Sequence, residues 1–385
     1  MKKELVSILS DLIALPSPYP PGTSVEICAY AAKRLKAAGY KVEIATRTKG
    51  VDNVVARRKG KAKGPVIAFN AHVDTVGVGE RANWKSDPYK ALVKGGLVHG
   101  LGAGNCKGSM AVQLWLAEEI ARRGGPARGE LIFTFVADEE NLGPDGMEFL
   151  RKSGKVKPDA LILGAQTENN LIVAERGVLW AKITTKGKAA HAGNPGAGDN
   201  AILRMMRLVG ALQSYYDKAL AKRTLKIQGG GAMRSTVNVG MFHGGHNTNV
   251  VPSACTVEID RRLLPDEKVK AAFAELKKVI DGAGEPKSQY TVEFLTGTNG
   301  FFAPENGAAV GAFEAAVKQQ TGRKVKFLNA TGVSDGRYYA DDGIEIINFG
   351  PGSGAQGHAA NESVPISEMV EAAEIQLEVV QRLLG

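Results

Sequence analysis

The chain has 385 residues and a formal net charge of +9. This length exceeds the roughly 250–300 residues at which a single core stops growing, so we expect two domains. Hydrophobic residues make up 44% and charged residues 23% of the sequence, as in an ordinary soluble globular protein. The basic residues are spread along the chain without a basic–aromatic motif, so we expect no nucleic-acid partner.

The N-terminal segment superficially resembles a signal peptide, because it combines two lysines with apolar residues. However, Glu4 and Asp11 interrupt it, and Ile8, Leu12 and Leu15 share one face of a helix. We therefore expect a first helix of the mature protein and a cytoplasmic location. No apolar run approaches the roughly 20 residues of a membrane helix, so no membrane partner is expected. Three cysteines far apart in the chain suit a reducing compartment.

Helix and strand patterns alternate in the first part of the chain. A helix is expected over residues 24–38, ending at Gly39, and another near residues 108–121. Short β-rich runs lie at residues 41–45, 53–56, 66–70 and 131–137. This order predicts the α/β class, with a mostly parallel sheet flanked by helices.

The middle of the chain has a different pattern. Strands are expected at residues 179–185, 235–242, 255–260 and 289–295, with helices starting at Asp199 and at residue 266. This order predicts an inserted α+β domain of the βαββαβ type with its own core. A helix at 306–320, a strand at 344–349 and a helix at 365–384 then return to the first pattern. We expect residues 1–177 and 296–385 to form the catalytic domain, and residues 178–295 the insertion.

Two pairs of polar residues each follow a predicted strand. His72 and Asp74 follow the first, and Glu139 and Glu140 follow the second. Ligands bind beyond the carboxyl ends of strands in such sheets. A metal-binding His commonly donates its other N–H to a carboxylate, which suits His72 and Asp74. The same H-x-D pattern is also typical of a turn or a helix N-cap.

Adjacent carboxylates at Glu139 and Glu140 are costly if both point the same way. Different tasks resolve this: one binds a metal ion, while the other accepts a proton from water. A solvated acidic turn is the alternative for this pair taken alone. His358, in the Gly-rich segment GSGAQGHAANE, would supply the second imidazole of a carboxylate-rich metal site.

In combination and order, these motifs resemble the M20 metallopeptidase family, the group of acetylornithine deacetylase, succinyl-diaminopimelate desuccinylase and carboxypeptidase G2. The resemblance spans essentially the whole chain. Its carriers are FNAHVDTV, GLGAGNCKGSMA, VADEENLGPDG, GAQT, KGKAAHAGNPGAGDNAI, NVVP followed by DRRLLP, SDGRYY and GHAANE.

The resemblance implies a role for each residue of the first part of the site. His72, Glu140 and His358 would be metal ligands, Asp74 would orient His72, and Glu139 would be the general base. The enzyme class implied is a metallohydrolase acting on C–N bonds.

The resemblance also implies roles outside this group. His191, in the insertion, would reach the partner subunit's site and polarise the scissile carbonyl. Asn249 and Arg262 would contact the substrate or its carboxylate, and Arg337 is a weaker candidate for the same purpose. The family dimerises through its insertion, so we expect a homodimer and a small-molecule substrate bearing a carboxylate.

Three positions depart from the family pattern. Asn105 replaces an Asp that bridges two metal ions, Ala165 replaces a Glu ligand, and Leu101 replaces an Arg. An Asn side chain offers one neutral oxygen, and an Ala side chain offers none. Whether the first two residues are natural or introduced is left open by the sequence.

The altered ligands affect two metal sites unequally. Glu140 and His358, with Asn105 as a possible third ligand, retain one site, whereas His72 would be the one strong ligand of the other. We therefore expect one divalent ion per chain, zinc, manganese or cobalt, and a second ion is doubtful. Glu168 is the first candidate to replace a lost ligand.

The leading hypothesis is metal-dependent hydrolysis of an N-acyl amino acid or a dipeptide. Retention of Glu139 supports it, because a protein without catalytic activity needs no proton acceptor there. One alternative is deamination of a small, possibly aromatic, amino compound. The other is a catalytically inactive binder of small molecules.

Overall fold

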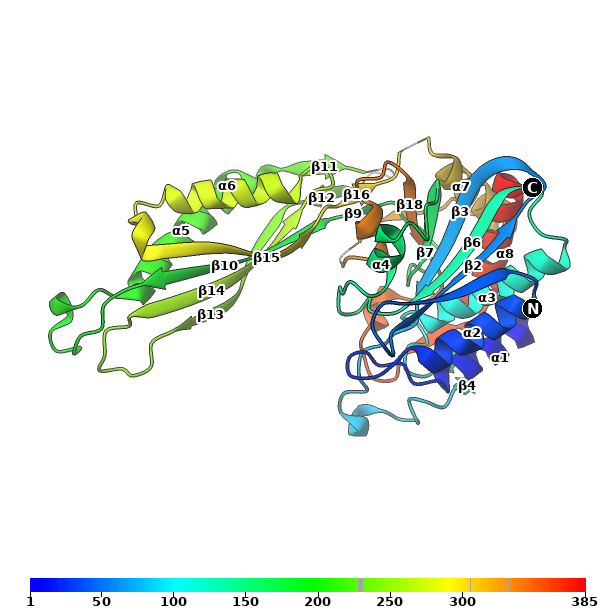
Figure 1. Ribbon diagram of the computed structural model, residues 1–385, viewed down its shortest axis with the longest axis horizontal. Coiled ribbons are helices and arrows are strands. Elements are labelled where there is room, and N and C mark those ends of the chain that lie inside the picture. The colour runs from blue at the N-terminus through cyan, green and yellow to red at the C-terminus, as the bar shows by residue number, and fades with distance from the viewer. Residues whose placement is uncertain (228–230, 305, 331) are drawn as a thin grey trace. The chain divides into compact units, whose positions relative to one another are not determined.

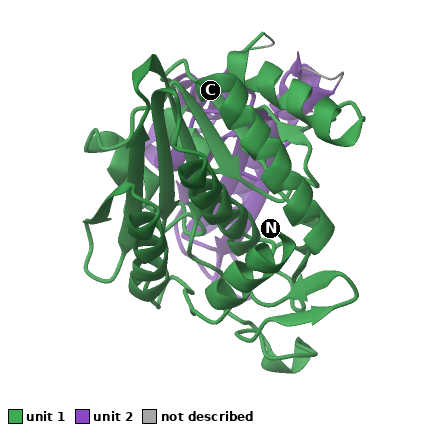
Figure 2. Cartoon of the chain, turned by 90° about the vertical axis from the view of Figure 1, so that its right-hand side faces the viewer, with its two compact units in different colours: residues 1–173, 303–328, 334–385 green, residues 174–302, 329–333 purple. Residues whose placement is uncertain are grey.

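The computed structural model describes residues 1–227, 231–304, 306–330 and 332–385 (Figure 1). The chain forms two compact units (Figure 2). Unit 1 comprises residues 1–173, 303–328 and 334–385, and unit 2 comprises residues 174–302 and 329–333. The domain boundaries expected from the sequence, at residues 178 and 296, stay a prediction.

Unit 1 is built on an eight-stranded sheet in the order β1-β2-β6-β3-β7-β18-β8-β17. The strands are β1 (Lys41–Thr46), β2 (Asp52–Lys59), β3 (Ala62–His72), β6 (Arg128–Val136), β7 (Ala160–Gly164), β8 (Leu171–Ile172), β17 (Phe327–Leu328) and β18 (Glu345–Phe349). Neighbours in the central run β6-β3-β7-β18 are parallel, whereas β1 and β2 are antiparallel at one edge. The α/β class is confirmed, with a mixed sheet that is parallel at its centre.

Five helices share the main core of unit 1 with this sheet. They are α1 (Lys2–Ile13), α2 (Val25–Ala37), α3 (Lys107–Arg122), α7 (Ala308–Thr321) and α8 (Ile366–Leu384). Alternate strand residues such as Ile67, Phe69 and Ala71 point into this core, as the two-residue period of a strand requires. A short helix, α4 (Met147–Lys152), and a three-stranded sheet of β4 (Leu92–Lys94), β5 (Leu97–His99) and β19 (Ser363–Pro365) complete the unit.

Unit 2 contains an antiparallel sheet in the order β13-β14-β10-β15. Its elements, in chain order, are β10 (Gly177–Lys186), α5 (Ala201–Lys218), β13 (Thr236–Gly244), β14 (Ala254–Leu263), α6 (Val269–Asp281) and β15 (Tyr290–Thr298). Both helices pack on the sheet around a separate core that includes Ile183, Leu208 and Val257. The βαββαβ order is therefore confirmed. Two short pairings, β11 (Thr224–Lys226) with β12 (Ala232–Arg234) and β9 (Ala174–Glu175) with β16 (Phe301–Phe302), were not expected.

Helix α5 begins later than expected, and its cap explains why. The side chain of Asn200 accepts hydrogen bonds from the N–H groups of Ile202 (2.9 Å) and Leu203 (3.2 Å). Asn200 is therefore the N-cap, a position that favours Asn as much as Asp. Asp199 instead pairs with Arg204 inside the helix.

Within the described residues, no helix has both the length and the apolar character needed to cross a membrane.

Candidate functional site

The parallel centre of the sheet brings the predicted site residues of unit 1 to one edge. Strands β6, β3, β7 and β18 are consecutive neighbours, so their carboxyl ends meet there (Figure 1). His72 is the last residue of β3, and Glu139 and Glu140 follow the end of β6. Ala165 directly follows β7, and the segment containing His358 follows β18.

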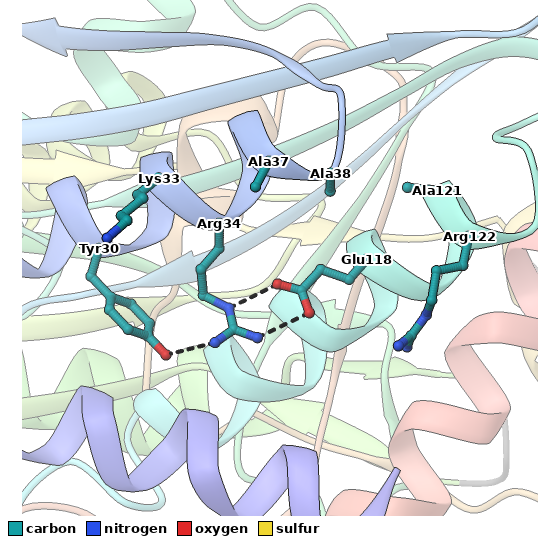
Figure 3. Close-up of a pocket in the computed structure, with 8 residues that line it drawn as sticks. All are labelled: Tyr30, Lys33, Arg34, Ala37, Ala38, Glu118, Ala121 and Arg122. Atoms are coloured by element: carbon teal, nitrogen blue, oxygen red, sulfur yellow. Dashed lines mark hydrogen bonds and ion pairs between the residues drawn. The ribbon is translucent and has the colours of Figure 1, made fainter.

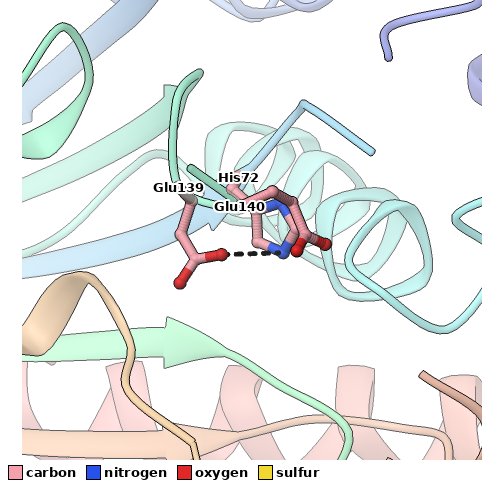
Figure 4. A group of neighbouring side chains, drawn as sticks. All are labelled: His72, Glu139 and Glu140. Atoms are coloured by element: carbon pink, nitrogen blue, oxygen red, sulfur yellow. Dashed lines mark ion pairs between the residues drawn. The ribbon is translucent and has the colours of Figure 1, made fainter. Parts of the chain in front are cut away.

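His72, Glu139 and Glu140 form a group in which one ligand atom from each lies within 4.8 Å of the others (Figure 4). The Nε2 atom of His72 is 4.0 Å from Oε2 of Glu139. His72 is 6% exposed, so its ring is held by the surrounding protein. Two carboxylates that flank one imidazole are the kind of oxygen and nitrogen donors that divalent zinc, manganese and cobalt accept.

His358 approaches the same group through Glu140. Its Nε2 atom lies 2.8 Å from Oε2 of Glu140. Two ligand atoms bound to one tetrahedral ion lie about 3.4 Å apart, so a small outward movement would admit an ion between them. The His358 side chain is 56% exposed, which leaves room for that movement. The residues present therefore fit one ion.

Asn105 links both sides of the group through its amide. Its Oδ1 atom is 3.2 Å from Nε2 of His72, and its Nδ2 atom donates to Oε1 of Glu140 at 2.6 Å. Nδ2 also lies 3.4 Å from Nε2 of His358. One amide thus contacts three of the expected ligands, but only one of its two polar atoms is able to bind a cation.

Asp74 contacts two of the expected ligands, through its backbone carbonyl and its carboxylate. The Nδ1 atom of His72 is 3.0 Å from the backbone carbonyl oxygen of Asp74 and 3.5 Å from its carboxylate Oδ1. The other carboxylate oxygen, Oδ2, accepts the backbone N–H of Glu140 at 3.1 Å. The carbonyl of Asp74 therefore fixes the ring, while its fully buried carboxylate connects the His72 and Glu140 segments.

Arg337 lies beside Glu139 and is almost fully buried. Its Nη1 atom is 3.6 Å from Oε1 of Glu139, and Nη2 is 3.9 Å from Oδ1 of Asp335. Tyr338 covers the guanidinium, with 4.4 Å between Arg337 Cζ and the ring centroid. Nη1 and Nε of Arg337 have no hydrogen-bond partner. Both nitrogens are buried, and Nη1 is the one that lies next to Glu139. Asp335 and Tyr338 were not among the predicted site residues, although both stand in the SDGRYY segment.

The pKa values within the group reflect burial and a shortage of positive charge. Burial raises the pKa of Glu139 to about 8, although His72 and Arg337 oppose this shift. Burial lowers the pKa of His72, but its hydrogen bond to Asp74 and the nearby acidic groups outweigh this and raise it. Burial also raises the pKa of Asp335. Protons here balance negative charge that a divalent ion would balance instead.

Ala165 directly follows β7, which runs parallel to β3, the strand that ends at His72. The loss of a ligand at this position stays a prediction. Glu168, suggested above as a replacement, is exposed and is not among the grouped ligands.

Three of the predicted residues lie in unit 2. His191 is exposed and forms a bridge with Val250, next to Asn249. The Nδ1 atom of His191 accepts the N–H of Gly193 at 3.0 Å, which leaves the proton of a neutral ring on Nε2. Arg262, on β14, donates to Asp260 at 2.9 Å.

A separate hollow of about 660 Å³ lies between α2 and α3 (Figure 3). It is lined by Tyr30, Lys33, Arg34, Ala37, Ala38, Glu118, Ala121 and Arg122. Arg34 donates to both carboxylate oxygens of Glu118, at 2.8 and 2.9 Å, and to the hydroxyl of Tyr30 at 3.0 Å. Its charge is thus satisfied internally, and none of the predicted site residues lines this hollow.

Comparison with known proteins agrees with the motifs. The model of peptidase family M20/M25/M40 matches residues 68–382. A succinyl-diaminopimelate desuccinylase from Xanthobacter autotrophicus is 29% identical over 393 residues, covering 98% of each chain. A tripeptidase structure from Staphylococcus aureus gives a TM-score of 0.81 at 23% identity, covering 100% of this chain and 99% of that one. An M20 family metallo-carboxypeptidase from Sulfolobus solfataricus gives 0.79 at 20% identity, covering 99% of both. At these identities the two structures support the fold alone.

Proposed function

The chain belongs to peptidase family M20/M25/M40 and is a hydrolase of C–N amide bonds, and we propose that its substrate is a small N-acyl amino acid or dipeptide. We further propose that it works with one divalent ion per chain. The observation that carries this proposal is the convergence of His72, Glu139 and Glu140, with His358 only 2.8 Å from Glu140.

The residues of unit 1 divide the work of such a reaction. We assign Glu140 and His358 as the ligands of the ion, and His72 as a weaker contributor. The oxygen of Asn105 would join Glu140 and His358 once its amide turns over, because Nδ2 now faces these two residues and Oδ1 faces His72. When bound, the ion would supply Lewis-acid chemistry, polarising the scissile carbonyl and acidifying a nearby water. Glu139 would accept the proton of the attacking water and pass it to the leaving nitrogen.

The protonation state of Glu139 is consistent with that assignment. In the absence of an ion its raised pKa, about 8, would keep the carboxyl protonated near neutral pH. A nearby cation favours the charged form and would lower this pKa. Metal binding would thus convert Glu139 from a proton donor into a proton acceptor.

The substrate is proposed to carry a carboxylate. The guanidinium of Arg337 lies beside Glu139, and Arg262 is a second candidate, on unit 2. We infer from the family resemblance that Asn249 contacts the substrate and that His191 polarises the scissile carbonyl in the partner subunit's site. A neutral His191 with its proton on Nε2 is suited to donate to a carbonyl oxygen. The homodimer through the insertion and the cytoplasmic location stay predictions.

A second candidate function is a binder without catalytic activity, and the Asn105 amide favours it. That amide already connects His72 with Glu140, so it satisfies both side chains without an ion. In this case His72, Asn105 and Glu140 would stabilise the pocket through their mutual hydrogen bonds. The pocket would then bind a small molecule without converting it.

The proposal is tested with a panel of N-acyl amino acids and dipeptides, in the presence of zinc, manganese or cobalt. Amide hydrolysis would release a carboxylic acid and an amine in equal amounts from at least one substrate. Release of ammonia from an aromatic amine, without any acid product, would instead support deamination. No product from either panel, together with ligand binding in calorimetry, would support the inactive binder.

A further inference from the structure

Glu362 is buried directly below the Asn105 loop and takes no part in the ligand group. Its residue is 3% exposed. Its backbone is fixed, because the next residue begins β19, which pairs with β5, and its carbonyl oxygen accepts the N–H of Gly100 at 3.1 Å. The side chain of Glu362 therefore projects from a rigid edge toward the loop that connects β5 with α3.

The Glu362 carboxylate accepts three backbone N–H groups of that loop. Oε2 accepts the N–H of Gly102 at 2.7 Å. Oε1 accepts those of Gly104 at 2.9 Å and Asn105 at 2.6 Å. Hydrogen bonds to an ionised carboxylate are stronger than neutral ones, so three of them fix a loop that forms no strand or helix.

The close approach of the loop is visible in the space around Gly104. A Cβ atom at this position would lie 2.5 Å from Nε2 of Gln166 and 3.1 Å from Oε1 of Glu362. The first distance is shorter than a Cβ atom makes and the second is tight, so a side chain at this position would displace the end of Gln166 and press on the carboxylate of Glu362. Glu362 thus supplies the carboxylate, and Gly104, which has no side chain, leaves the gap that lets the loop approach it.

Asn105 connects the loop held by Glu362 with the ligand group. The backbone of Asn105 is held by Glu362, while its side chain contacts His72, Glu140 and His358 at 2.6–3.4 Å. The same short segment also carries His358, four residues before Glu362. One stretch of chain therefore supplies an expected ligand and the anchor of its neighbour.

We propose that Glu362 is a positioning residue that sets the place of Asn105 in the metal pocket through these three backbone N–H groups. This inference rests on the proposed function for its effect on metal binding, but its effect on the loop does not. Loss of an outer-shell partner of a metal site typically weakens metal binding by about 10–100-fold.

The first test replaces the charge and keeps the size. In Glu362→Gln, one amide oxygen still accepts the two N–H groups at Oε1, but the NH₂ group faces the N–H of Gly102. We expect the Gly102 amide to exchange with deuterium at least about tenfold faster, and the zinc Kd to rise about tenfold or more. Exchange is followed by NMR with ¹⁵N-labelled Gly and Asn, and the Kd by calorimetry.

The matched control is Glu368→Gln. Glu368 is a half-buried carboxylate that accepts one backbone N–H, from Gly352 at 2.7 Å. We expect faster exchange of the Gly352 amide and an unchanged zinc Kd in this variant. A second variant, Gly104→Ala, removes the gap instead of the anion and should weaken zinc binding in the same direction as Glu362→Gln.

Some outcomes would overturn the inference. Exchange at Gly102 within about twofold of wild type in Glu362→Gln would show that the carboxylate does not hold the loop. An equal rise of the zinc Kd in Glu362→Gln and Glu368→Gln would reduce Glu362 to a general structural role. If Glu362→Gln aggregates, Glu362→Asp is measured, because its shorter side chain must lose at least one of the three bonds. A wild-type protein that takes up no metal would refute the proposed function alone, since amide exchange would still decide the role of Glu362.

Discussion

Two clusters of buried charged side chains, one in each unit, differ in how far their charges are compensated. In unit 2, Arg261 is 1% exposed and donates to Glu267 and Glu275, each at 2.8 Å. Arg223 pairs with the same two carboxylates. In unit 1, the corresponding cluster contains His72, Glu139 and Glu140. Arg337 lies next to it and pairs with both Glu139 and Asp335.

The pKa shifts follow this difference. Burial raises the pKa of Glu275, but the bonds from Arg223, Tyr215 and Arg261 outweigh it and hold that pKa at about 2. In unit 1 the pKa of Glu139 is instead raised to about 8. In the unit 2 cluster two arginines pair with the two carboxylates, whereas in the unit 1 cluster Arg337 is shared between Glu139 and Asp335. This difference supports the proposal that the unit 1 cluster is the functional one.

The largest expected effect is the loss of turnover in Glu139→Ala, which removes the carboxylate with the raised pKa from the unit 1 cluster. Turnover of the best substrate should fall about 10²–10⁴-fold, because no other carboxylate is placed to accept the proton. Metal content should stay unchanged, as Glu140 and His358 remain. The control is Glu148→Ala, whose carboxylate pairs with Lys152 on α4. Turnover near wild type in Glu139→Ala would remove this residue from the role of base.

The unit 2 cluster should respond in stability and not in metal binding. Arg261→Met leaves the carboxylates of Glu267 and Glu275 with one partner fewer, and should cost about 3–5 kcal/mol in urea unfolding. Arg262→Met, in which a half-buried pair with Asp260 is lost, should cost less than about 1 kcal/mol. Equal losses in the two variants would mean that burial does not distinguish these neighbouring arginines.

The two expected metal sites of unit 1 differ in how many ligands they retain, and restoring the expected ligands should remove this difference. Asn105→Asp combined with Ala165→Glu should raise the metal content from about one to about two ions per chain, because both sites then have an anionic ligand set. Each single variant is the control for the other. Elemental analysis after dialysis measures the result. An unchanged metal content in the double variant would show that these positions do not correspond to ligands.

The smallest effect concerns the acid sensitivity of unit 2. The folded pKa of Glu275 lies near 2, below the unfolded value of about 4.3, so its contribution to stability is present above that value. It is lost as the pH falls from about 4.3 toward 2. Glu275→Gln should therefore show a shallower loss of urea resistance between about pH 6 and about pH 3. Parallel curves for the variant and wild type would contradict the paired state of this carboxylate.

The sequence indicated the candidate residues of the pocket because they stand in recognisable segments. His72 and the Glu139–Glu140 pair follow strands whose pattern is clear, and His358 stands in a Gly-rich loop. Their convergence also depends on β7, a five-residue strand that the pattern did not predict and that lies between β3 and β18. A strand this short has no periodicity that distinguishes it from a loop.

Other features depend on contacts between distant segments. Glu362 accepts hydrogen bonds from Gly102, Gly104 and Asn105, which precede it in the sequence by 260, 258 and 257 positions. No local sequence pattern indicates a contact between segments so far apart. The Nδ1 atom of His72 lies closer to the backbone carbonyl of Asp74 than to its carboxylate. This preference depends on the backbone geometry, so the sequence does not indicate it. The N-cap of α5 is Asn200 and not Asp199, which shows how two adjacent residues with similar capping ability leave a boundary undecided.

The pocket of His72, Glu140 and His358 is proposed to hold one divalent ion. Elemental analysis of protein purified without a chelator measures this metal content. We predict about one equivalent of zinc, manganese or cobalt per chain, reduced at least about tenfold in His358→Ala. Less than about a tenth of an equivalent, with no uptake after addition of any of the three metals, would contradict it.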